Sequence, residues 1–130
     1  MSGQTFGPYP ARVAAIHDGD TMTLDIDLGF DHLISGQDWN GKTRLACRIL
    51  GVNAPELSTA AGKAALAYAE TLLKVGDLVQ VVSHGWDKYG GRFDGAVTLA
   101  SGVDFATAMI AANQAAPWDG TGVKPVPTGP

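Results

Sequence analysis

Alternating apolar and polar side chains predict a β-hairpin near the start of the chain. From Met22 to Leu28 every second residue is apolar, which is the pattern of a strand with one buried face. Residues 11–16 form a mostly apolar segment before it and predict a first strand. The connecting residues 18–20, Asp-Gly-Asp, are typical of a tight turn. The two strands are therefore expected to pair directly.

Three further strands are predicted along the chain. Residues 29–42 contain glycines among polar residues and are expected to form an extended connection. A third strand follows at residues 43–50. Residues 78–83 and 93–99 have the apolar character of two more strands and flank a glycine-rich turn.

Two segments have the spacing of helices. Apolar residues recur every three or four positions across residues 59–74, with Ser58 or Thr59 as the expected N-cap and Gly76 just past the end. Residues 104–113 predict a second helix. The order is thus three strands, a helix, two strands and a helix.

This order favours one small barrel over a parallel α/β sheet, which would need helices between most of its strands. We predict an α+β fold, a small five-stranded OB-type β-barrel with a helix inserted after strand 3 and a C-terminal helix. The barrel domain is expected over residues 9–120, after an N-terminal arm at 1–8. Residues 121–130 are rich in glycine and proline and are expected to form a tail.

Composition agrees with a single domain. The chain has 130 residues, of which 45% are hydrophobic and 17% charged, so it is long enough to bury one core. Its N-terminus has no basic stretch followed by an apolar run, so we expect no signal peptide and a cytoplasmic or phage-encoded protein. Cys47 is the single cysteine and is expected to be a small buried side chain.

The net charge of −4 argues against tight, non-specific coating of nucleic acid, because such binding usually needs a surplus of lysine and arginine. Positive charge can still be supplied locally by a metal ion and two arginines. Residues 18–21, 48–56 and 87–92 together contain carboxylates, an amide and two guanidinium groups. This set suits metal-assisted attack on a phosphodiester. Each segment alone also has an ordinary interpretation, as a hairpin turn, a helix entry or surface ion-pair partners.

The ordered set of motifs resembles the thermonuclease, or staphylococcal nuclease-like, family. The motifs are Asp-Gly-Asp-Thr at 18–21, Arg-Ile-Leu-Gly-Val-Asn-Ala-Pro-Glu at 48–56, Lys-Tyr-Gly-Gly-Arg at 88–92 and Pro-Trp-Asp-Gly at 117–120. The resemblance implies an OB barrel, one calcium ion (Ca²⁺) and cleavage of single-stranded or loosened DNA and RNA that leaves a 3′-phosphate. The long insertion after Leu28 is similar to phage and actinobacterial members.

For the metal, the resemblance implies that Asp20, Asn53 and the main-chain oxygen of Ala54 bind calcium. Calcium takes six to eight oxygen ligands and accepts carboxylates, amides and carbonyls, so these residue types suit it. The family more often has aspartate at the position of Asn53. A neutral amide keeps an oxygen donor but attracts a divalent cation less strongly.

For the chemistry, the resemblance implies that Glu56 is the general base or orients the attacking water. Arg48 and Arg92 would bind the phosphate oxygens in fork geometry and stabilise the charge that develops in the transition state. Lys88 and Tyr89 match positions that contact a neighbouring phosphate and would bind substrate.

Three classes of function stay open from the sequence. The first is the calcium-dependent nuclease. The second is an OB module that binds nucleic acid or protein without cutting, favoured if Asn53 disables the metal site. The third is a structural component of a larger assembly such as a virion, with a protein partner that orders the termini. We expect no membrane partner.

The histidines and tryptophans are expected to be ordinary surface, rim or core residues, with Trp118 anchoring the second helix; an alternative role for the indoles is stacking on bases. These residues are His17, His32, His84, Trp39, Trp86 and Trp118.

Overall fold

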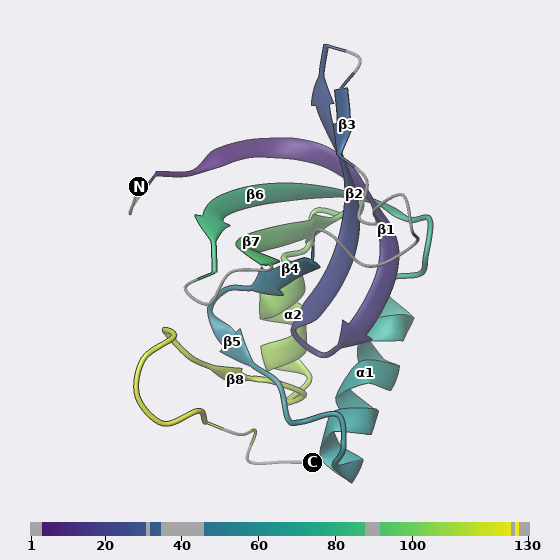
Figure 1. Ribbon diagram of the computed structural model, residues 1–130. Coiled ribbons are helices and arrows are strands. Elements are labelled where there is room, and N and C mark those ends of the chain that lie inside the picture. Colours follow the sequence, from purple (N-terminus) through teal and green to yellow (C-terminus); the bar gives the residue numbers. More distant parts are fainter. Residues whose placement is uncertain (1–3, 31, 35–45, 88–91, 126, 128–130) are drawn as a thin grey trace.

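The computed structural model describes residues 4–30, 32–34, 46–87, 92–125 and 127, and shows a closed five-stranded mixed β-barrel with two helices (Figure 1). Neighbouring strands follow the order β1-β6-β7-β4-β2, and a β1–β2 pairing closes the barrel. The pairing of β4 with β7 is parallel and the others are antiparallel. The barrel strands are β1 (Phe6–Asp18), β2 (Thr21–Gly29), β4 (Ala46–Ile49), β6 (Leu78–Trp86) and β7 (Arg92–Leu99).

The remaining elements extend or cover this barrel. β3 (His32–Ile34) pairs with the end of β2, and the short strands β5 (Val52–Asn53) and β8 (Ala116–Pro117) pair with each other. α1 (Ala60–Leu72) packs against β1, and α2 (Phe105–Ala111) packs against β7. Figure 1 shows both helices on the side of the barrel that also carries β5 and β8. Within the described residues neither helix is long and apolar enough to span a bilayer.

The core follows from the alternation of the strands. Met22, Leu24 and Ile26 of β2 are buried, and β7 alternates buried and half-buried positions along its whole length. Cys47 is also fully buried, and burial raises the pKa of its thiol to about 12, so it behaves as a small apolar side chain as expected.

The β1–β2 turn packs closely against residue Ala54, which follows β5, and against α1. Asp18 Oδ1 accepts a hydrogen bond from the Asp20 N–H at 3.0 Å, which closes the turn. A Cβ atom on Gly19 would lie 2.7 Å from the Cβ of Ala54 and 3.1 Å from that of Ala65 in α1. Only glycine therefore allows this close approach, which brings Asp20 next to residues 53–54.

The entry to α1 is the one predicted from the sequence. Thr59 is the N-cap, and its Oγ1 accepts from the Gly62 N–H at 3.0 Å. The same hydroxyl donates to the carbonyl of Glu56 at 2.6 Å. The cap therefore also fixes the backbone at Glu56.

The predicted fold class is confirmed, while several boundaries differ. β1 begins at Phe6, because Phe6 pairs with Ser83, so part of the predicted N-terminal arm belongs to the sheet. Residues 32–34, predicted as connection, form β3. The strand predicted at 43–50 is seen as β4 at 46–49, and its first three residues lie outside the described part. β5 and β8 have only two residues each, too few for a periodic pattern to reveal them.

We expect the substitution Gly62→Ala to lower the free energy of unfolding by about 2 kcal/mol or more, although glycine to alanine usually stabilises a helix. The reason is that the added Cβ would lie 1.8 Å from the Glu56 carbonyl oxygen. Urea denaturation measures the change. The neighbouring variant Lys63→Ala, at an exposed helical position, should change the value by less than about 0.5 kcal/mol. A Gly62→Ala protein as stable as wild type would contradict this account of the helix entry.

Candidate functional site

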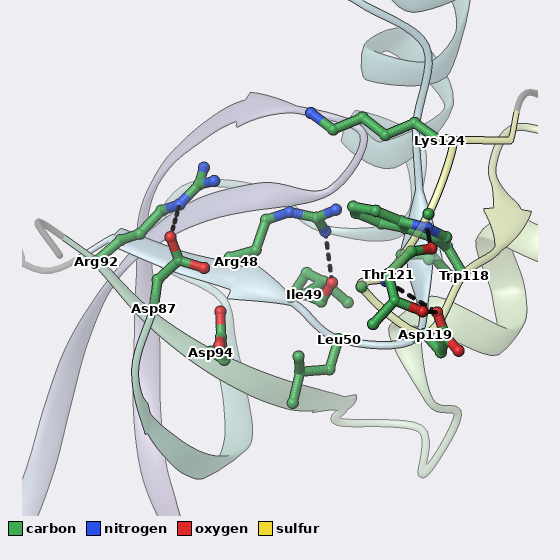
Figure 2. Close-up of a pocket in the computed structure, with 14 residues that line it drawn as sticks. Arg48, Ile49, Leu50, Asp87, Arg92, Asp94, Trp118, Asp119, Thr121 and Lys124 are labelled. Carbon is green, nitrogen blue, oxygen red and sulfur yellow. Dashed lines mark hydrogen bonds and ion pairs between the residues drawn. The ribbon is translucent and has the colours of Figure 1, made fainter. Parts of the chain in front are cut away.

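A cleft of about 720 Å³ lies between the ends of β4 and β7 and the chain that follows β8. We call it the arginine cleft, because Arg48 and Arg92 both reach into it (Figure 2). Its lining residues are Arg48, Ile49, Leu50, Gly51, Val52, Asp87, Arg92, Asp94, Trp118, Asp119, Gly120, Thr121, Gly122 and Lys124.

Arg48 is held by three groups. Its Nη1 donates a hydrogen bond to the carbonyl of Ile49 at 2.6 Å and lies 3.5 Å from Oδ2 of Asp20. Its Cζ lies 5.8 Å from the centre of the Trp118 ring, within the range of a cation–π contact. The side chain is only 12% exposed. Its guanidinium is therefore oriented before any ligand binds.

Arg92 is less restrained. It begins β7, and its Nε lies 3.6 Å from Oδ2 of Asp87, with 38% of the side chain exposed. The parallel pairing sets Ala46 beside Arg92 and Arg48 beside Asp94. The two arginines therefore come from adjacent strands, two positions apart in register, and Figure 2 shows them both in the cleft.

Asp20 is the buried carboxylate of the site. It is 8% exposed, and its Oδ2 accepts a hydrogen bond from the Ala54 N–H at 2.9 Å. Its Oδ1 accepts from the Thr21 hydroxyl at 3.2 Å. Burial, reinforced by the hydrogen bond with Asp18, raises the pKa of Asp20 to about 6, against the lowering effects of Ala54 and Arg48. The carboxylate thus carries a charge that its surroundings only partly compensate.

Asn53, in β5, directly precedes Ala54 and is 7% exposed. Its Nδ2 donates a hydrogen bond to the carbonyl of Pro125 at 3.0 Å. Its backbone pairs with Ala116 of β8. Of the three residues that the family resemblance assigns to calcium, the structure therefore joins Ala54 to Asp20 through a main-chain hydrogen bond, with Asn53 next to Ala54 in the chain.

The other predicted site residues are placed differently. Glu56 is exposed, and its carbonyl accepts hydrogen bonds from Thr59, which puts it at the entry to α1. Among the described residues, the predicted site residues that line the arginine cleft are Arg48 and Arg92. The lining does not include Glu56 or the three predicted metal ligands, Asp20, Asn53 and Ala54. Lys88 and Tyr89 lie outside the described residues.

Acidic side chains also line the cleft, among them Asp94, which belongs to none of the sequence motifs. The pKa of Asp94 is raised, first by partial burial and then by hydrogen bonding to Asp87 and the charge of that group. A sequence signal exists for Asp94, because residues two apart in a strand share a face and Arg92 precedes it by two.

The chain after β8 supplies a wall of the cleft. The main-chain N–H of Trp118 donates to the carbonyl of Gly51 at 2.9 Å. The indole faces Arg48, so Trp118 packs on the cleft. The expected role of anchoring the second helix does not describe these contacts. Lys124 places its Nζ 5.9 Å from the same ring. No local pattern in a glycine- and proline-rich segment could have identified this lysine.

The other tryptophans differ as well. Trp86 is 69% exposed at the end of β6, and Trp39 lies outside the described residues. In the described part of the chain no three His, Cys, Asp or Glu side chains gather closely enough to hold a metal by themselves. A cation beside Asp20 would therefore need amide, main-chain and water oxygens.

No protein-family model matches this chain. No curated protein is similar to it at a significant level.

We expect the Asp20 carboxyl to titrate with a midpoint near pH 6 in the calcium-free protein, because burial disfavours its charged form. Carbon-detected NMR measures this midpoint, and Asp20→Asn assigns the resonance. Since the folded-state pKa lies above the ordinary 3.8, the proton stabilises the fold below about pH 4, and this contribution is lost as the pH rises through 6. Relative to Asp20→Asn, wild type should lose about 2 to 3 kcal/mol between pH 4 and 7. A midpoint near 4 would contradict the expected effect of burial.

Proposed function

We propose that this protein is a calcium-dependent nuclease that hydrolyses phosphodiester bonds of DNA and RNA with little sequence preference and leaves 3′-phosphates. The observation that carries the proposal is the convergence of Arg48 and Arg92 from adjacent strands in one cleft, with Arg48 also paired to the buried Asp20. The 3′-phosphate ends of the products and the choice of calcium rest on the resemblance of the motifs to the thermonuclease family.

The arginines are suited to bind and stabilise a phosphoryl group. A guanidinium presents several N–H donors in one plane and matches two phosphate oxygens at once, which lysine does not. Arg48 is preoriented by Ile49 and Asp20, so little rearrangement is needed as charge develops on the phosphate. Arg92 is more exposed and can approach a phosphate from the neighbouring strand.

Asp20, Asn53 and Ala54 fit a calcium ion by their chemistry. Asp20 offers a carboxylate and Ala54 a main-chain carbonyl, and Asn53 keeps Oδ1 as an acceptor because its Nδ2 is already donating to Pro125. These are the hard oxygen donors that calcium prefers. When bound, calcium would polarise the phosphoryl oxygen and lower the barrier to attack by water.

Glu56 is the proposed general base. Its side chain is exposed and therefore accessible to water, while the Thr59 cap holds its backbone. The resemblance, and not a position in the arginine cleft, assigns this carboxylate to accept the proton of the attacking water. The indole of Trp118 could stack on any nucleobase, because every nucleobase has a π face, and this agrees with low sequence preference.

We expect calcium-dependent cutting of single-stranded DNA that leaves 3′-phosphate ends and stops with excess chelator. Glu56→Gln and Arg48→Ala should each lower the rate at least about 100-fold, because one removes the proton acceptor and the other a transition-state donor. Glu70→Gln, at an exposed position of α1, is the matched control and should cut like wild type. End-labelled products resolved on a gel report rate and end chemistry. Equal cutting by wild type and Glu56→Gln would overturn the assigned base.

We also expect Asn53→Asp to bind calcium about tenfold more tightly, because a carboxylate attracts the cation more strongly than an amide does. Isothermal titration calorimetry above pH 7 measures the affinity. Gln80→Glu, which makes the same chemical change at an exposed position of β6, should leave it unchanged. Unchanged affinity in Asn53→Asp would remove Asn53 from the metal site.

A second candidate is an OB module that binds nucleic acid without cutting it. The observation that favours it is the pairing of Arg48 with Asp20 and of Arg92 with Asp87, which leaves each cation partly neutralised. A folded protein that binds a labelled oligonucleotide but never cuts it, in calcium and at high concentration, would select this candidate.

A further inference from the structure

We propose that Asn53 is a positioning residue that fastens the chain after β8 as a wall of the arginine cleft, and so holds Lys124 where a second phosphate of a nucleic-acid strand binds. This segment, residues 118–125, is called the C-terminal loop below. The choice of ligand rests on the proposed nuclease function, whereas the positioning itself does not.

Both ends of the C-terminal loop are attached to residues 51–53, in β5 and just before it. At its start, Ala116 of β8 pairs with Asn53, and the Trp118 N–H donates to Gly51. At its end, the Pro125 carbonyl accepts from Asn53 Nδ2 at 3.0 Å, across 72 positions of sequence. The chain thus pairs with Asn53 at Ala116 and contacts the same residue again at Pro125. The second contact is made by the side chain of Asn53, which closes the loop.

The loop is also bonded internally. Asp119 Oδ1 accepts from the Thr121 N–H at 2.9 Å and from its hydroxyl at 2.7 Å. The Trp118 indole Nε1 donates to the Thr121 carbonyl at 2.7 Å, as Figure 2 shows. These bonds give the first half of the loop a defined shape. The second half, up to Pro125, depends on Asn53.

Lys124 is the residue that this attachment positions. It immediately precedes Pro125, and Figure 2 shows its side chain extending over Trp118 on the opposite side of the cleft from Arg92. Its Nζ lies 5.9 Å from the indole centre, and Arg48 lies 5.8 Å from the same point. If Arg48 and Arg92 bind one phosphate, Lys124 is placed for the next phosphate along the strand.

This role explains why the residue is asparagine. A carboxylate has no hydrogen to donate, so aspartate at position 53 would set an acceptor against the Pro125 carbonyl in a nearly closed site. An amide satisfies the carbonyl with Nδ2 and still offers Oδ1. The neutral side chain therefore has a structural purpose, beside any effect on a metal.

The test is hydrogen–deuterium exchange of the intact protein without calcium. We expect Asn53→Asp to speed exchange of peptides from the C-terminal loop at least tenfold, while peptides of β6 and β7 stay protected and report an intact barrel. Asn53→Ala removes the same donor without burying a charge and should give the same result. Gln80→Glu is the matched control. Unchanged exchange of the loop in both Asn53 variants would overturn the proposal.

A second measurement tests the ligand. Fluorescence anisotropy follows binding of a labelled oligothymidylate in chelator, at several salt concentrations. Lys124→Ala and Asn53→Ala should each weaken binding about five- to tenfold and lower the salt dependence by about one released counterion, which a merely structural change would not do. Lys124→Ala should add little in the Asn53→Ala background. Lys74→Ala, just after α1, is the control for loss of one charge.

The outcomes separate the two proposals. If wild type never cuts, but the Asn53 variants speed exchange of the C-terminal loop and Lys124→Ala lowers the salt dependence of binding, the nuclease is rejected and the positioning role is retained. If wild type cuts, but exchange of the loop is unchanged in the Asn53 variants, the nuclease is retained and the positioning role is rejected. Salt slopes that are identical in wild type and Lys124→Ala would reject the second phosphate site.

Discussion

The carboxylate of Asp20 joins three parts of the chain that are separate in sequence. It sits at the β1–β2 turn, accepts the Ala54 N–H and faces Arg48 of β4. The close approach that makes this possible requires Gly19, because a side chain there would collide with Ala54. Burying a charge in this way is costly, and burial accordingly raises the pKa of Asp20. The rest of the fold must therefore supply the stability that offsets this desolvation cost.

The arginine cleft gathers cationic side chains in an acidic protein, together with the carboxylates of Asp87, Asp94 and Asp119. The net charge is −4, yet Arg48, Arg92 and Lys124 are gathered on one opening. The carboxylates of Asp20 and Asp87 orient two of these cations and lower the cost of holding them there without ligand. An incoming phosphate would compete with these carboxylates, which favours binding at a defined position over general adhesion to nucleic acid.

Asn53 links the part of the chain that binds Asp20 to the C-terminal loop that carries Lys124. Its neighbour Ala54 binds Asp20, and its own amide binds Pro125. A change at this position therefore reaches both the buried carboxylate and the loop that carries Lys124. The family resemblance accounts for Asn53 only as a weaker metal ligand, whereas the structure gives the amide a bond that aspartate could not make.

The sequence by itself determined the local parts: the strands from their alternation, the turn at Asp18–Asp20 and the Thr59 cap, because these depend on neighbouring residues. It also indicated Arg48 and Arg92, through motifs; their chemistry stays a prediction. Only the tertiary structure decided that Arg48 lies beside Asp94, and that a segment expected to be a tail closes on Asn53. The physical reason is that parallel pairing and a contact across 72 positions are set by the closed barrel, and leave no periodic trace in the residues that make them.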